Sequence, residues 1–120
     1  MATKRKRRPK INIGSEELEA EIYHDKVYVS DNNISVIAEL EPFNPNTDAK
    51  EEVSGTITFK KNIPLDIFMH QTSDPKKLFV GFFGSEELDT LIKTLKIATV
   101  CLEKVRDQRS EEVAKYVEDN

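Results

Sequence analysis

The residues most able to do chemistry are cations at the very start of the chain. Five are consecutive and a sixth follows two positions later: Lys4, Arg5, Lys6, Arg7, Arg8 and Lys10. A run of this kind neutralises phosphates and releases their counterions, so its binding to nucleic acid is sequence-tolerant and weakened by salt. Like-charge runs are usually disordered interaction tails, and they also serve as nuclear-localisation signals. We expect residues 1–10 to be a disordered basic arm that binds nucleic acid; a localisation signal and a solubilising tail are the alternatives.

Aromatic rings with neighbouring lysines form the second group suited to binding. Period-two alternation gives each predicted strand a core side, and Tyr28, Phe68, Phe79 and Phe83 fall on the opposite sides. Exposed rings stack on unpaired bases, which contributes about 1–3 kcal/mol per base. The residues predicted to touch a single strand in this way are Tyr28, Lys60, Lys61, Phe68, Lys77 and Phe79. The alternative is a barrel or a second layer that buries the same rings as core.

Residues that could support catalysis or metal binding form no recognisable pattern. His24 and His70 lie far apart in sequence, and neither sits in a Ser, Cys or carboxylate motif. Asp25 follows His24, but adjacent strand residues point to opposite faces. Cys101 is the one cysteine, so a single chain cannot form a disulfide or a cysteine zinc site. We expect no enzyme, no cofactor and no metal.

Length and charge limit the classes of protein that remain. The 120 residues suffice for one domain, and 38% hydrophobic with 33% charged residues suits a globular body. Residues 11–120 hold 12 basic against 22 acidic side chains, a balance of −10. An acidic body repels phosphate, so any nucleic-acid surface on it must be local. With no long apolar run, no membrane partner and an intracellular location, cytoplasmic or nuclear, are expected.

The elements that must position these residues are strands and one helix. Alternating apolar and polar residues predict an α+β fold, with an antiparallel sheet of five to six strands before a long helix. The predicted strands are 18–22, 27–30, 34–40, 53–60, 65–69 and 78–83. Residues 41–52 are predicted to be a loop, because they carry two prolines, two asparagines and several charges.

The helix is predicted to begin at Gly84-Ser85-Glu86-Glu87, where acidic side chains favour the helix dipole. Apolar residues from Leu88 to Val105 recur at helical spacing, in a stripe wider than one sheet face needs. The helix is therefore either buried deep in the fold or shared with a second copy. In the second case Leu91, Leu95 and Leu102 form the dimer interface. The domain is predicted to span residues 11–109, with a polar tail or short helix over 110–120.

This order of elements resembles a known family. Strands, a turn and Gly84-Ser85-Glu86-Glu87-Leu88 opening an amphipathic helix are similar to the single-stranded-DNA-binding transcriptional coactivator positive cofactor four and its Whirly and Pur-type relatives. The resemblance covers residues 18–105. It implies a curved sheet that binds single strands, a helix that dimerises and a charged tail in front. The residues whose positions match the arrangement of this family are those of the arm and Lys60, Lys61, Lys77, Phe79, Leu91, Leu95 and Leu102.

The sequence thus predicts a non-enzymatic protein that binds single-stranded DNA or RNA beside a transcription or replication machine. The alternative is a small adaptor or inhibitor of the viral type. Its acidic body would dock on a basic surface of a nucleic-acid-processing protein, with electrostatic steering driving association.

Overall fold

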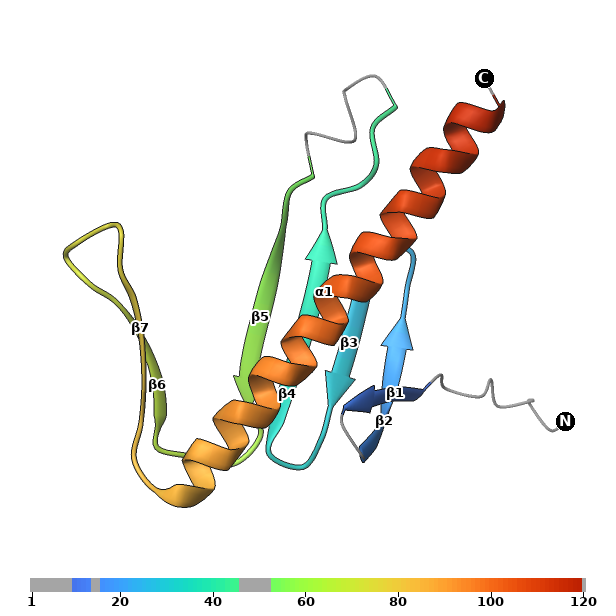
Figure 1. Ribbon diagram of the computed structural model, residues 1–120. Coiled ribbons are helices and arrows are strands. Elements are labelled where there is room, and N and C mark those ends of the chain that lie inside the picture. Colours follow the sequence, from blue (N-terminus) through green and yellow to red (C-terminus); the bar gives the residue numbers. More distant parts are fainter. Residues whose placement is uncertain (1–9, 14–15, 46–52, 120) are drawn as a thin grey trace, which may run out of the picture.

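Seven strands precede one helix in the computed structural model, which describes residues 10–13, 16–45 and 53–119 (Figure 1). The strands are β1 (Lys10–Ile13), β2 (Glu16–Ile22), β3 (Lys26–Ser30), β4 (Ile34–Leu40), β5 (Gly55–Lys61), β6 (Ile67–Gln71) and β7 (Leu78–Phe82). The helix is α1 (Ser85–Asp119). The predicted antiparallel sheet with a long C-terminal helix is confirmed.

Strands β1 to β5 form an open antiparallel sheet in sequence order, with β1 and β5 at its edges. Helix α1 crosses one face of this sheet (Figure 1). Val29 is paired with Ala20 on one side and with Val36 on the other, and all three are buried. Tyr28 is paired with Glu21 and Ile37 on the other face, which α1 leaves uncovered. The alternation predicted from the sequence therefore separates a helix-covered face from an open face.

The core lies between the helix-covered face and α1. Its buried members on the helix are Ile97, Ala98, Cys101 and Val105. Its buried members on the strands and the segment after β5 are Ile11, Ile13, Leu18, Ala20, Val27, Val29, Ile34, Val36, Ala38 and Leu65. Branched aliphatic residues on the sheet facing a helix stripe of period 3.6 are the usual way for such layers to pack.

An ion cluster at the end of the sheet that carries the β3–β4 turn ties the first half of α1 to the sheet. The ammonium of Lys93 lies 2.7 Å from Asp31 Oδ2 and 2.9 Å from Glu16 Oε1. Burial by itself would raise the pKa of Asp31. The bond from Lys93 and those from the backbone N–H groups of Ile34 and Asn33 outweigh it and hold the pKa below 3.8. Burial opposes the charge on Lys93 too, but the two carboxylates raise its pKa above 10.5. The pair is therefore ionised over the whole neutral range.

The structure corrects the predicted start of the domain. Lys10 belongs to β1, which pairs with β2, and its ammonium lies 3.7 Å from a carboxylate oxygen of Glu17. The body thus begins one residue before the predicted position and includes a strand that the sequence did not predict. The other arm residues, Lys4, Arg5, Lys6, Arg7 and Arg8, lie outside the described residues. So do residues 46–52 of the predicted loop.

The predicted boundary at residue 110 is also wrong, because α1 continues through it to Asp119. Residues 85–119 contain neither proline nor glycine, so nothing in the sequence ends the helix there. Arg109 is buried on the sheet side and anchors the second half of α1 to the rest of the fold. The residues predicted to be a separate tail are therefore the last turns of one helix.

Strands β6 and β7 form a separate two-stranded sheet. This hairpin projects from the body beside β5 and leads into the first turn of α1 (Figure 1). Gly84 makes the junction with a φ of 118°, in a region that residues with a side chain rarely adopt. A Cβ there would also lie 2.6 Å from a carboxylate oxygen of Glu87. Glycine is therefore required where the hairpin turns into the helix.

Candidate functional site

The β6–β7 hairpin has two chemically different faces. Strand register places Phe68, His70 and Phe79 on one face, which we call the aromatic face. The opposite face, called the apolar face, carries Ile67, Met69, Leu78, Val80 and Phe82 together with Gln71. Apart from Ile67, which is half-buried, the large apolar side chains of both faces are exposed. An isolated hairpin in water is marginally stable, so both faces are suited to contact a ligand or partner.

Phe68 and Phe79 form a ring pair on the aromatic face. Their centroids are 5.8 Å apart with planes tilted by 42°, and the residues are 52% and 50% exposed. Gly81 lies opposite Phe68 across the strands, and a Cβ at that position would come within 2.3 Å of the Phe68 ring. The pair thus depends on glycine to let the ring lie flat over β7. Both rings were predicted from the sequence to be exposed, and the structure brings them together.

The hairpin region is cationic within an acidic body. Residues 60–83 contain four lysines and two aspartates and no glutamate. Lys76 and Lys77 lie in the turn between β6 and β7, where the backbone N–H of Lys76 donates to Asp74 Oδ1 at 2.9 Å. They immediately precede β7, the strand that carries Phe79. Rings and cations together are the combination that single strands require.

Lys60 and Lys61 do not act together, since adjacent strand residues point to opposite faces. Lys60 is paired with Ser35 and lies on the open face of the sheet. Lys61 lies on the helix side, where its ammonium donates to the backbone oxygens of Leu65 and Ile67, at 3.0 Å each. Lys61 therefore holds the base of the hairpin, and only Lys60 of the two is directed to the open face.

Tyr28, the remaining predicted contact, lies apart from the hairpin on the open face of the sheet. Its hydroxyl lies 3.4 Å from Ser35 Oγ, and hydrogen bonding with Ser35 and Ser30 lowers the pKa of Tyr28. Strand parity places Glu19, Glu21 and Glu39 on the same face. Tyr28 is thus set among carboxylates, a poor environment for a phosphate backbone.

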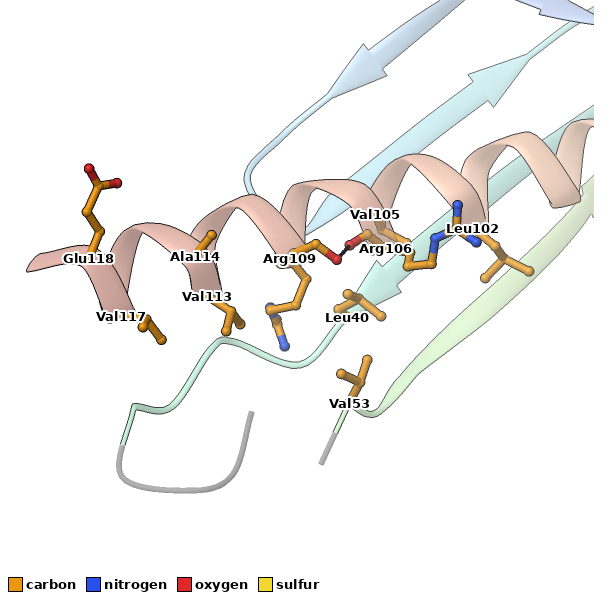
Figure 2. Close-up of a pocket in the computed structure, with 11 residues that line it drawn as sticks. Leu40, Val53, Leu102, Val105, Arg106, Arg109, Val113, Ala114, Val117 and Glu118 are labelled. Carbon is orange, nitrogen blue, oxygen red and sulfur yellow. Dashed lines mark hydrogen bonds between the residues drawn. The ribbon is translucent and has the colours of Figure 1, made fainter. Parts of the chain in front are cut away.

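The predicted dimer residues lie along the β5 side of α1. Leu95 and Leu102 are 55% and 44% exposed, and Leu91 is half-buried. Leu91 and Leu95 line a groove of about 330 Å³ between α1, Phe59 of β5 and the hairpin, which contributes Ile67, Met69 and Val80 of its apolar face and Phe68 of its aromatic face. Leu102 lines a second, larger cavity of about 660 Å³ nearer the C-terminal end of α1 (Figure 2). The wall of this second cavity is mostly aliphatic: Leu40, Val53, Val105, Val113, Ala114 and Val117.

A buried arginine, which the sequence analysis did not single out, closes the inner wall of the second cavity. Arg109 Nη2 donates to Asp25 Oδ1 at 3.2 Å and to the backbone oxygen of Glu41. Its guanidinium also lies 5.8 Å from the ring centroid of Phe43. Asp25 and Glu41 are 84 and 68 residues away in sequence, so no local pattern could have revealed these contacts.

Asp25 also contributes to the single cluster of potential metal ligands found within the described residues. His24 Nδ1 lies 3.2 Å from Asp25 Oδ2, and His24 Nε2 lies 2.9 Å from Glu112 Oε2. The guanidinium of Arg109 already supplies positive charge to Asp25. The arrangement is accounted for as an ion-pair network that joins the β2–β3 turn to α1.

Helix α1 is long, but within the part of the chain that the structure describes no helix combines the length and apolar character needed to cross a membrane. Comparison of the chain with protein-family models, with curated proteins and with solved structures finds no match.

Proposed function

We propose that this chain is a non-enzymatic protein that binds single-stranded DNA or RNA, in association with transcription or replication. Two elements carry the binding. The cations at residues 4–8 neutralise phosphates, and the aromatic face of the β6–β7 hairpin stacks on unpaired bases. The observation that supports this most is the half-exposed Phe68–Phe79 ring pair on a projecting, locally cationic hairpin.

The hairpin supports this proposal better than the open face of the sheet does. Stacking requires a ring that a base can reach, and Phe68 and Phe79 are 52% and 50% exposed on a hairpin that projects from the body (Figure 1). Lys76 and Lys77 at its tip attract the backbone of the same strand. On the open face, by contrast, Tyr28 has acidic neighbours. We therefore assign stacking to the hairpin and no stacking to Tyr28.

The test of the arm is a comparison of two variants that keep its length. In the first, Lys4, Arg5, Lys6, Arg7 and Arg8 are all replaced by Gln. In the second, each Lys becomes Arg and each Arg becomes Lys. Affinity for a fluorescent single-stranded 20-mer is measured by anisotropy as a function of salt. The first variant should lower the slope of log K against log [salt] by about 3.5, and the second should leave it unchanged. Equal slopes for both variants and the parent chain would remove the arm from the proposal.

The open face of the sheet favours a second candidate function, an adaptor that docks on a basic protein. Glu19, Glu21 and Glu39 share that face with Glu17, and these four outnumber Lys10, Lys26 and Lys60 there. Acidic surfaces of this kind steer association with cationic partners. The adaptor requires a protein complex that survives neutralisation of the arm and is lost when Glu21 and Glu39 are changed to Lys. A complex that is lost when the arm is neutralised, and that survives the changes of Glu21 and Glu39 to Lys, would exclude the adaptor.

A further inference from the structure

The apolar face of the hairpin and the larger cavity lie at opposite ends of one side of α1. The hairpin joins the first turn of the helix, and Met69 and Val80 face the groove beside Leu95. The larger cavity is lined by helix residues from Leu102 to Glu118 (Figure 2). Both hollows open between α1 and the β4–β5 side of the sheet, since Phe59 lines one, and Leu40 and Val53 line the other.

The hairpin cannot fill the larger cavity of its own chain. From Leu91 to Val117 the helix rises about 39 Å, at 1.5 Å per residue. A five-residue strand such as β6 spans only about 16 Å. The projecting hairpin also diverges from α1, since it lies to the left of β5 while the C-terminal half of α1 runs to the upper right (Figure 1). Each chain therefore has an exposed apolar projection at one end of this side and, at the other, an apolar cavity that none of the described residues fills.

We infer that a second copy of this chain covers this side, with the β6–β7 hairpin of each copy packed into the larger cavity of its partner. A two-fold axis that crosses the two helices between residues 95 and 102 sets them antiparallel. This places the hairpin of one copy at the C-terminal half of the partner's helix, and the reverse contact follows by symmetry. The apolar face of the hairpin then packs against the partner's Val113 and Val117.

Three observations favour a second copy as the occupant. A projection and a cavity on the same side are what a self-complementary two-fold interface needs. The second observation is area. At roughly 200 Å² for a fully exposed side chain, the exposed parts of seven side chains present about 700 Å² of apolar surface per copy. A standard interface buries roughly 800 Å² per partner. These side chains are Met69, Leu78, Val80, Phe82, Leu95, Leu102 and Val117.

The third observation is charge. The turn of the hairpin carries Asp74 beside Lys76 and Lys77, and the rim of the cavity carries Arg106 and Glu118. Both signs are present on each surface, so opposite charges can meet at the border of the contact. His70 and Phe79 lie on the face of the hairpin opposite to Met69 and Val80, whereas Phe68 also lines the groove beside Leu95.

The contact is tested by cross-linking between introduced cysteines in the full chain. In the double variant Val80→Cys and Val117→Cys, a short bismaleimide linker should join chains into a covalent dimer. Each single variant should remain uncross-linked. The native Cys101 can stay in place, because it is fully buried and burial raises the pKa of its thiol to about 11. A cross-link between two copies of the single variant Val117→Cys would show that the C-terminal ends of the two helices lie side by side. That result would overturn the antiparallel arrangement.

Mass measurement by light scattering gives an independent test. The parent chain should elute at twice the monomer mass, and Val80→Lys, on the apolar face, should give monomer. The matched variant His70→Lys adds the same charge to the aromatic face of the same hairpin and should remain dimeric. A monomeric parent chain at 100 µM would overturn the inference, as would equal loss of the dimer in both variants. None of these readouts involves nucleic acid, so a failure of the dimer can be distinguished from a failure of the proposed function.

Discussion

Phe68 and Phe79 lie diagonally across β6 and β7 with ring centroids 5.8 Å apart, each about half exposed. Rings that a protein keeps for its core are buried, and this pair is outside the core formed by the sheet and α1. It also shares its hairpin with two consecutive lysines, Lys76 and Lys77. The proposed stacking site follows from this combination.

Removing either ring of the pair should weaken single-strand binding. Phe68→Ala and Phe79→Ala are each expected to reduce affinity by about 5-fold to 150-fold, since one stacked base is worth about 1–3 kcal/mol. Phe83→Ala is the matched control, because Phe83 is 78% exposed but lies beyond the last paired residue of β7. Anisotropy with the labelled 20-mer measures all three. A loss for Phe83→Ala equal to that of the other two would mean that no specific ring pair is used.

Gly81→Ala should weaken the same binding without removing a ring. The new methyl group would lie 2.3–2.9 Å from three carbon atoms of the Phe68 ring, so the ring must move off β7. The expected result is a loss of affinity comparable to that of Phe68→Ala, with the salt dependence unchanged because no charge is altered. Val80→Ala, the adjacent position on the opposite face, serves as the control. Unchanged affinity for Gly81→Ala would argue that the position of the Phe68 ring is unimportant.

Lys93 should stabilise the fold only where both it and Asp31 are charged. The pKa of Asp31 is lowered, so its contribution is complete above about pH 4 and is lost as the pH falls through its folded value. The pKa of Lys93 is raised, so its contribution is complete below 10.5 and is lost above its folded value. Lys93→Met should therefore cost roughly 1 kcal/mol at pH 7 and less at pH 2, because the contribution falls as Asp31 takes up its proton. Urea unfolding at the two pH values measures this, and an equal cost at both would contradict the ion-pair account.

Arg109 should be among the most destabilising positions on the second half of α1. Arg109→Met would remove the donor to Asp25 Oδ1 and to the backbone oxygen of Glu41, at a cost of about 3 kcal/mol. Lys104→Met removes a cation from the exposed side of the same helix and should change the free energy of unfolding by less than about 0.5 kcal/mol. Urea unfolding at a fixed protein concentration compares them. Similar losses for both variants would show that the buried contacts of Arg109 contribute little.

The sequence predicted the layers of this fold better than the first strand and the end of the helix. Alternation was enough for β2 to β7, because each strand has one buried side or an apolar side. Strand β1 was missed because four residues beside a run of cations give too short a pattern. The continuation of α1 past residue 110 was missed because Arg106, Arg109 and Ser110 interrupt the apolar stripe between Val105 and Val113. Long-range contacts of Arg109, Glu112 and Tyr116 hold that segment.

The predicted binding residues were also separated by the fold in ways that the sequence only partly indicates. Strand alternation alone shows that Lys60 and Lys61 point to opposite faces. The sequence therefore already indicated that only one of them could belong to the predicted binding residues. That Phe68 and Phe79 meet depends on the register of β6 with β7, which the turn sets. The separation of Tyr28 from that pair depends on β6 and β7 forming a sheet of their own, which no local pattern encodes.

The most direct test of the account is the affinity of the full chain for a labelled single-stranded 20-mer and for the matching duplex, measured by anisotropy from 50 to 200 mM salt. We predict tighter binding to the single strand at every salt concentration, because only unpaired bases can stack on the hairpin rings. Affinity for both should fall steeply with salt, because the arm contributes through phosphates. Equal affinity for the two forms would reduce the proposal to non-specific binding by the arm, and no binding to either would contradict it.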